Sequence, residues 1–190
     1  MIINDMKEKK EKKKKKENNS GLLKKARFLT HASLIAAVYA ALTIWLAPIS
    51  FGQQQLRIAE ALAVLPAFTP AAIPGLFIGC AIANTVSFLG LPDLIFGSLA
   101  TLISAQLTYM LSRILRDRGA LIRSLLIPLP AVIINTVVIG AMLAVLTGVE
   151  YWVAAAGVFA GQTLSCYGLG APLMVVLRSC GRYINAKYAK

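Results

Sequence analysis

The chain has 190 residues, of which 57% are hydrophobic and only 15% are charged. A soluble domain has about 45–50% apolar and about 25% charged residues, so the composition excludes an ordinary soluble protein and indicates one compact membrane domain. The net charge is +12, but the lysines concentrate beside an apolar segment. An anionic lipid surface is therefore a simpler partner than nucleic acid, and we predict no nucleic-acid binding.

The N-terminal residues 1–27 contain eleven of the 20 lysines and arginines. A run of like charges repels itself and stays solvated, so we expect a disordered, lysine-rich cytoplasmic tail. Four further basic residues lie within 113–123, and the last four lie within 178–190. Because cytoplasmic loops retain Lys and Arg, this pattern places both termini in the cytoplasm, with a short C-terminal tail at 181–190.

Six apolar segments over residues 28–180 predict an all-α integral membrane protein with six transmembrane helices. A helix needs about 20 residues to cross a hydrocarbon core of about 30 Å, so the short second segment has to be tilted, broken or buried among the others. Six spans, unlike five, keep the cationic C-terminal tail in the cytoplasm. The approximate bounds are 28–49, 56–68, 71–89, 92–111, 121–146 and 151–177.

The first apolar segment carries Ala32, Ala36 and Ala40 at four-residue intervals. Small residues at this spacing form a smooth helix face that another helix can approach closely. The face is equally compatible with internal packing and with docking on another membrane protein.

Four charged residues lie far from the basic clusters: Arg57, Glu60, Asp93 and Glu150, the last at the predicted outer boundary of the membrane. Such groups are costly inside a membrane and mark functional sites. Glu60 follows Arg57 by three residues, so on a helix the two are expected to pair, either as a structural ion pair or as contacts for a polar solute. Asp93 opens the fourth segment, where a helix N-terminal charge and a ligand role explain it equally well.

Three amide side chains within the segments complete the predicted substrate site. Amides recognise a heterocycle through its donors and acceptors, although they also bond neighbouring helices. The predicted substrate-binding residues are Arg57, Glu60, Asn84, Asp93, Asn135 and Gln162.

The sequence lacks the motifs of an enzyme or an ATPase. It has no G-x-x-x-x-G-K-[ST] loop for ATP, and His31 is its only histidine. The three cysteines are widely spaced and offer no metal-ligand pattern. We therefore predict no catalytic residues, no metal and no cofactor bound by this chain.

Four stretches carry a family resemblance: Leu46-Ala-Pro-Ile-Ser-Phe-Gly52, Leu56-Arg-Ile-Ala-Glu-Ala-Leu62, Pro74-Gly-Leu-Phe-Ile-Gly-Cys-Ala-Ile-Ala-Asn84 and Phe96-Gly-Ser-Leu-Ala-Thr-Leu102. From about residue 28 onward the chain resembles the QueT family, predicted substrate-binding (S) components of energy-coupling factor (ECF) transporters. The resemblance implies a six-helix S-component bundle in a bacterial plasma membrane. It also implies docking on a transmembrane coupling subunit, through an A-x-x-x-A face matched by Ala32, Ala36 and Ala40, and two partner ATPases that hydrolyse the ATP.

The cargo implied by the resemblance is a queuosine precursor, a 7-deazaguanine such as preQ1 or preQ0. A guanine-like edge offers adjacent N–H donors to a carboxylate, for which Glu60 and Asp93 are the candidates. Gln162 stands where relatives are expected to have glutamate, which affects selectivity. The alternatives are an S component for another vitamin-like heterocycle, a stand-alone solute carrier, and an assembly factor without a solute.

Overall fold

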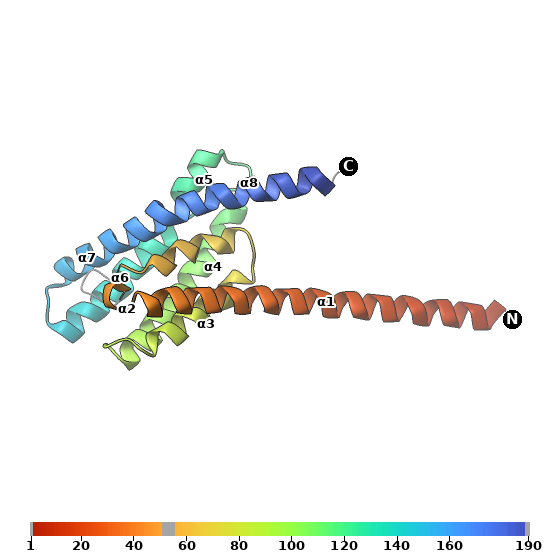
Figure 1. The fold of residues 1–190 in the computed structure, drawn as a ribbon, viewed down its shortest axis with the longest axis horizontal. Coiled ribbons are helices and arrows are strands. Elements are labelled where there is room, and N and C mark those ends of the chain that lie inside the picture. The colour runs from red at the N-terminus through yellow and green to blue at the C-terminus, as the bar shows by residue number, and fades with distance from the viewer. Residues whose placement is uncertain (1, 51–55, 189–190) are drawn as a thin grey trace.

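The computed structural model describes the backbone of residues 2–50 and 56–188, and side chains within 19–180 except at 49 and 51–55. Every regular element of these residues is helical (Figure 1). This confirms the all-α class. The elements in chain order are α1 Ile2–Trp45, α2 Ala47–Ser50, η1 Ile58–Ala67, α3 Ala72–Asn84, η2 Asp93–Gly97, α4 Ser98–Ile114, α5 Ala120–Leu126, α6 Leu129–Thr147, α7 Tyr151–Thr163, η3 Leu164–Gly170 and α8 Ala171–Tyr188.

The helices reproduce the six predicted apolar segments, but among the described residues four stretches have both the length and the hydropathy to cross a membrane. These are Asn19–Trp45, Asp93–Ile114, Ala120–Thr147 and Tyr151–Cys180. The second and third segments are the shorter helices η1 and α3, and η1 is a 3-10 helix with Pro66 inside it. Since about 20 residues are needed to span the hydrocarbon, these two are expected to cross only with support from their neighbours.

The structure differs from the disordered tail expected for residues 1–27, because α1 begins at Ile2 and continues without interruption to Trp45. Lys and Glu are good helix formers. In this stretch Glu8 precedes Lys12 by four residues and Glu11 precedes Lys15 in the same way, a spacing that supports a helix. The C-terminal tail predicted at 181–190 is likewise helical as far as Tyr188.

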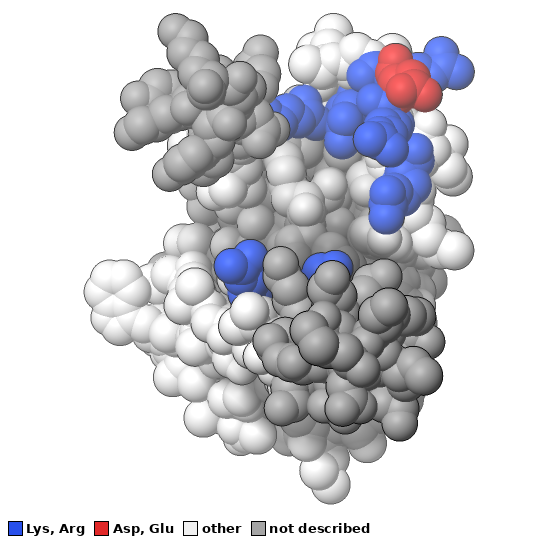
Figure 2. Space-filling model, turned by 90° about the vertical axis from the view of Figure 1, so that its right-hand side faces the viewer, with Lys and Arg blue, Asp and Glu red and all other residues white. Residues whose placement is uncertain are grey.

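Both ends of the described chain lie at the same end of the bundle (Figure 1). Figure 2 looks onto this end, where the described Lys and Arg side chains gather. We call it the basic end. The loops that join α3 to η2 and α6 to α7 lie at the opposite end (Figure 1). The predicted topology depends on Lys and Arg gathering on one side of the membrane, and the described basic side chains do gather at one end of the bundle.

Helix α1 packs closely on α3 through small residues. A Cβ atom at Gly75 would lie 2.8 Å from the backbone oxygen of Ala32, and one at Gly79 would lie 2.7 Å from that of Ala36. Glycine at these two positions allows the helix backbones to meet. The glycine pair of α3 therefore accepts the alanine face of α1.

This contact bears on the predicted docking role of Ala32, Ala36 and Ala40, which stays a prediction. The three side chains are buried against α3 in the isolated chain. Sequence spacing shows that a helix has a smooth face, but it does not show which helix covers that face. The glycine pair of α3 supplies a matching surface inside the molecule.

Candidate functional site

A buried polar cluster lies among α1, η1, α3, η2 and α4, towards the end opposite the basic end. Its ionisable members are Arg57, Glu60 and Asp93, which are 3%, 1% and 0% exposed. Arg57 directly precedes the 3-10 helix η1, and Asp93 opens the π-helix η2. Short π-helical segments occur frequently at functional sites.

Arg57 forms a buried ion pair with Asp93. Its Nη2 atom lies 3.0 Å from each carboxylate oxygen of Asp93. Asn84 Nδ2 donates to the backbone oxygen of Asp93 at 2.8 Å, which fixes the start of η2 against α3. A Cβ at Gly97 would lie 2.6 Å from Asn84 Nδ2 and 3.0 Å from Asp93 Oδ1, so glycine is needed for this approach.

Arg57 and Glu60 are neighbours on one 3-10 turn, but the ion pair of Arg57 is with Asp93. Arg57 is the N-cap of η1, with φ −91° and ψ 102°, and its backbone oxygen accepts a hydrogen bond from the Glu60 N–H at 3.0 Å. Glu60 attracts the guanidinium electrostatically, while the side chain of Arg57 reaches Asp93, which lies 36 positions further along the chain.

Glu60 is held by Tyr39 of α1, whose hydroxyl donates to Oε1 at 2.6 Å. The other oxygen, Oε2, is buried and makes no hydrogen bond of standard geometry. Asn135 of α6 is 3% exposed and interacts with the same carboxylate. A buried acceptor without a donor costs about 1–3 kcal/mol, so Oε2 is a position at which an incoming donor would be stabilising.

Two cysteines link the polar residues of different helices. Cys80 Sγ lies 3.4 Å from Asn84 Nδ2, 3.3 Å from Thr101 Oγ1 and 3.8 Å from Arg57 Nη1. Cys166 of η3 lies 3.5 Å from the backbone oxygen of Glu60 and 3.7 Å from Gln162 Oε1. Thiols are weak donors and acceptors, so these contacts satisfy buried polar groups without adding charge.

The structure thus buries all six predicted substrate-site residues and joins them through contacts. Arg57, Asn84 and Asp93 form one part, and Glu60 with Asn135 forms the other. Gln162 reaches the second part through Cys166. Asn84 Oδ1 is also buried without a donor, so the cluster holds a second open acceptor.

Three residues of the cluster were not predicted from the sequence: Tyr39, Cys80 and Cys166. Cys80 and Asn84 are four residues apart on α3, so helical periodicity places them on one face. The sequence spacing alone could therefore have predicted that Cys80 lies beside Asn84. Tyr39 interrupts the small residues of α1 and is fully buried. No pattern in the sequence pairs Tyr39 with Glu60, because their contact depends on how α1 and η1 pack.

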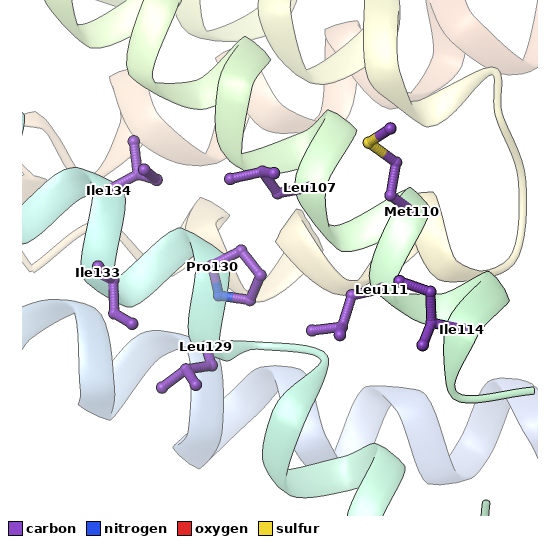
Figure 3. Close-up of a pocket in the computed structure, with 8 residues that line it drawn as sticks. All are labelled: Leu107, Met110, Leu111, Ile114, Leu129, Pro130, Ile133 and Ile134. Atoms are coloured by element: carbon purple, nitrogen blue, oxygen red, sulfur yellow. The ribbon is translucent and has the colours of Figure 1, made fainter.

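A separate surface groove of about 440 Å³ lies between α4 and α6. Leu107 and Leu111 of α4 point towards α6, where Pro130 lies opposite them (Figure 3). All eight side chains that line the groove are apolar, so they have no means of orienting a polar heterocycle. The buried polar cluster is therefore the better candidate for recognition of a polar solute.

Comparison with known proteins gives one match. The sequence model of the QueT transporter family matches residues 29–179, which include every residue of the buried polar cluster. No curated protein and no solved structure matches the chain.

Proposed function

Because the chain belongs to the QueT transporter family, which implies transport rather than catalysis, we propose that it is the substrate-capture (S) component of an ECF importer. The proposed cargo is a queuosine precursor of the 7-deazaguanine class, with preQ1 as the first candidate. The proposed location is a bacterial plasma membrane, with η1 and α3 completing six spans. In this topology the basic end faces the cytoplasm and the buried polar cluster lies in the outer half of the bundle.

The observation that carries the cargo proposal is the carboxylate of Glu60. One of its oxygens is held by Tyr39, while Oε2 is buried without a donor. A guanine-like edge presents adjacent N–H groups, and donors of this kind form strong bonds with a carboxylate. Asn84 Oδ1 offers a second acceptor, and the amide of Asn135 lies beside Glu60 to read an acceptor on the solute.

The charge of the cluster supports preQ1 over preQ0. The charges of Arg57 and Asp93 cancel in their ion pair, so in this proposal an ionised Glu60 would give the described cluster one net negative charge. A buried charge without a counter-charge is strongly destabilising. The aminomethyl cation of preQ1 would neutralise it, whereas the nitrile of preQ0 would not.

We propose a different role for Asp93 from the predicted substrate contact. Both of its carboxylate oxygens lie 3.0 Å from Arg57 Nη2, so we assign the solute contact to Glu60 and the positioning of Arg57 to Asp93. Gln162 contacts the Glu60 region only through Cys166. In this proposal it affects selectivity by keeping an acceptor near the site without adding charge.

The proposed partners are the ECF transmembrane coupling subunit and its two ATPases. With Ala32, Ala36 and Ala40 covered by α3, we assign docking to the outward face of α1, where Ser33, Ala37 and Ala41 are exposed at four-residue spacing. Small residues there allow close approach of a partner helix. Ala37→Leu should abolish uptake by cells that contain the whole transporter and leave solute binding unchanged.

The matched control for docking is Ala160→Leu, the same change at an exposed position of α7. It should leave uptake intact. Normal uptake with Ala37→Leu would contradict the docking assignment, and uptake without the ATPases would instead favour a stand-alone carrier.

Thermal unfolding of the purified full chain tests the cargo. A ligand present at 100 times its dissociation constant adds about 2.7 kcal/mol, which is a readily measured shift. The panel is preQ1, preQ0, guanine, riboflavin and biotin. A shift with preQ1 that Glu60→Gln removes would support the proposal. A shift with riboflavin or biotin alone would favour the alternative of another heterocycle, and no shift with any compound would contradict solute capture by the isolated chain.

A further inference from the structure

The basic end carries a pocket that the proposed function does not use. It has a volume of about 290 Å³ and lies between the end of η1, the last turns of α4, and α5. Arg113, Arg116, Arg123 and Tyr109 supply its polar wall, and Phe68 and Pro70 contribute to an apolar wall. We call it the arginine pocket.

The hydrogen bonds around the arginine pocket leave several donors open. Arg113 donates to Tyr109 Oη from Nε at 3.3 Å and from Nη2 at 2.8 Å. The tyrosine oxygen is thereby an acceptor twice, and its own O–H has no acceptor among the described residues. Arg123 Nη1 lies 3.5 Å from the backbone oxygen of Arg116, while Arg123 Nε is buried without any acceptor.

Three guanidinium groups around one pocket repel each other unless an anion lies between them. No described acidic side chain forms an ion pair with any of the three. A buried N–H without an acceptor is unfavourable. A ligand with several anionic oxygens would relieve both costs. Phosphate has this form, and the planar fork of arginine matches its geometry.

The surroundings favour a phosphate that belongs to a lipid. Helix α5 has no buried residue, and Leu121 and Leu125 are 74% and 54% exposed. A short helix that combines exposed apolar side chains with arginine is typical of the membrane interface. Basic pockets at that depth bind the head groups of anionic phospholipids, and Phe68 and Pro70 suit the glycerol and upper acyl carbons.

We propose that Arg113, Arg116 and Arg123 bind the phosphate group of an anionic phospholipid, with Tyr109 as an additional donor. The site is independent of the solute site at the other end of the bundle. Its failure would leave the proposed transport function untouched.

The test is thermal unfolding of the detergent-purified full chain against dioleoyl phosphatidylglycerol, dioleoyl phosphatidylcholine and inorganic phosphate. The two lipids have the same acyl chains, so a difference between them reports on the head group. The variant Arg116→Gln/Arg123→Gln removes two of the pocket's charges. Arg118→Gln is the control, because Arg118 lies in the same basic segment but does not line the pocket.

Phosphatidylglycerol should raise the unfolding midpoint and phosphatidylcholine should not. The double variant should need at least about ten-fold more phosphatidylglycerol for half of the shift, the loss expected for a charge-assisted bond, whereas Arg118→Gln should stay within about two-fold. Equal effects of the two lipids, or equal losses in the double variant and in Arg118→Gln, would overturn the site. A full shift with inorganic phosphate alone would overturn the lipid as the source of the phosphate.

Discussion

Arginine occurs at both ends of this bundle in opposite surroundings. At one end Arg57 is buried and shares its Nη2 atom with both oxygens of Asp93. At the basic end Arg113 and Arg116 are exposed and form no ion pair with a described acidic side chain. A charge removed from water needs a counter-charge inside the protein, whereas a charge at the interface is solvated by water and lipid. The same side chain is therefore paired with a buried carboxylate at one end and exposed at the other.

The largest expected effect comes from breaking the buried pair. Asp93→Asn removes the carboxylate that forms the ion pair with Arg57, and loss of one partner from a buried pair costs about 3–5 kcal/mol. The free energy of unfolding in detergent, measured with a chemical denaturant, should fall by that amount. Arg118→Gln at the basic end should leave it unchanged. Equal stabilities for these two variants would mean that the buried pair is solvated in the protein.

The two ends also differ in how closely their backbones are packed. A Cβ at Gly79 would lie 2.7 Å from the backbone oxygen of Ala36, while one at Gly119, in the loop before α5, would meet nothing within 4 Å. Gly79→Ala should destabilise the protein by about 1–3 kcal/mol, the usual cost of overpacking. Gly119→Ala should not destabilise it. The thermal midpoints of both variants check the difference, and an unaffected Gly79→Ala would show that α1 and α3 are less closely packed than described.

A smaller effect is expected at Glu60, the buried carboxylate outside the Arg57–Asp93 ion pair. Glu60→Gln should weaken binding of preQ1 by about 1.5 kcal/mol, the lower value for a hydrogen bond to a charged group. The matched control is Glu150→Gln, which changes an exposed carboxylate before α7. Isothermal titration with the folded variants measures the loss. Unchanged affinity in Glu60→Gln would assign Glu60 to structural support.

The smallest effect is expected from loss of the hydrogen bond between Tyr39 of α1 and the Glu60 carboxylate. Tyr39→Phe removes the 2.6 Å bond to Glu60 Oε1 and keeps the ring in place. We expect solute affinity to fall by about 1 kcal/mol, the typical value of one hydrogen bond. Tyr109→Phe at the basic end should not change solute affinity. If the two variants behaved alike, Tyr39 would not orient the carboxylate.

Hydrophobicity and charge were sufficient to predict the six apolar segments and the membrane class, because a bilayer sorts segments by composition. The same reasoning identified Arg57, Glu60 and Asp93, since few ionisable residues occur far from the basic clusters. Their contacts were not predictable. The side chain of Arg57 pairs with Asp93 of a different element, and the covering of the α1 alanine face depends on Gly75 and Gly79 of a different helix.

The sequence by itself determined that this protein resides in a membrane and which segments are apolar. It also determined which side chains have a high free-energy cost of burial unless they are paired. Those properties follow from transfer free energies of individual residues. The tertiary structure alone decided that Arg57 binds Asp93, that Tyr39 holds Glu60, and that Glu60 Oε2 stays open. The two contacts join residues that are more than 20 positions apart in the sequence, and the Oε2 atom has no hydrogen-bond donor. Both outcomes depend on how whole helices pack against each other.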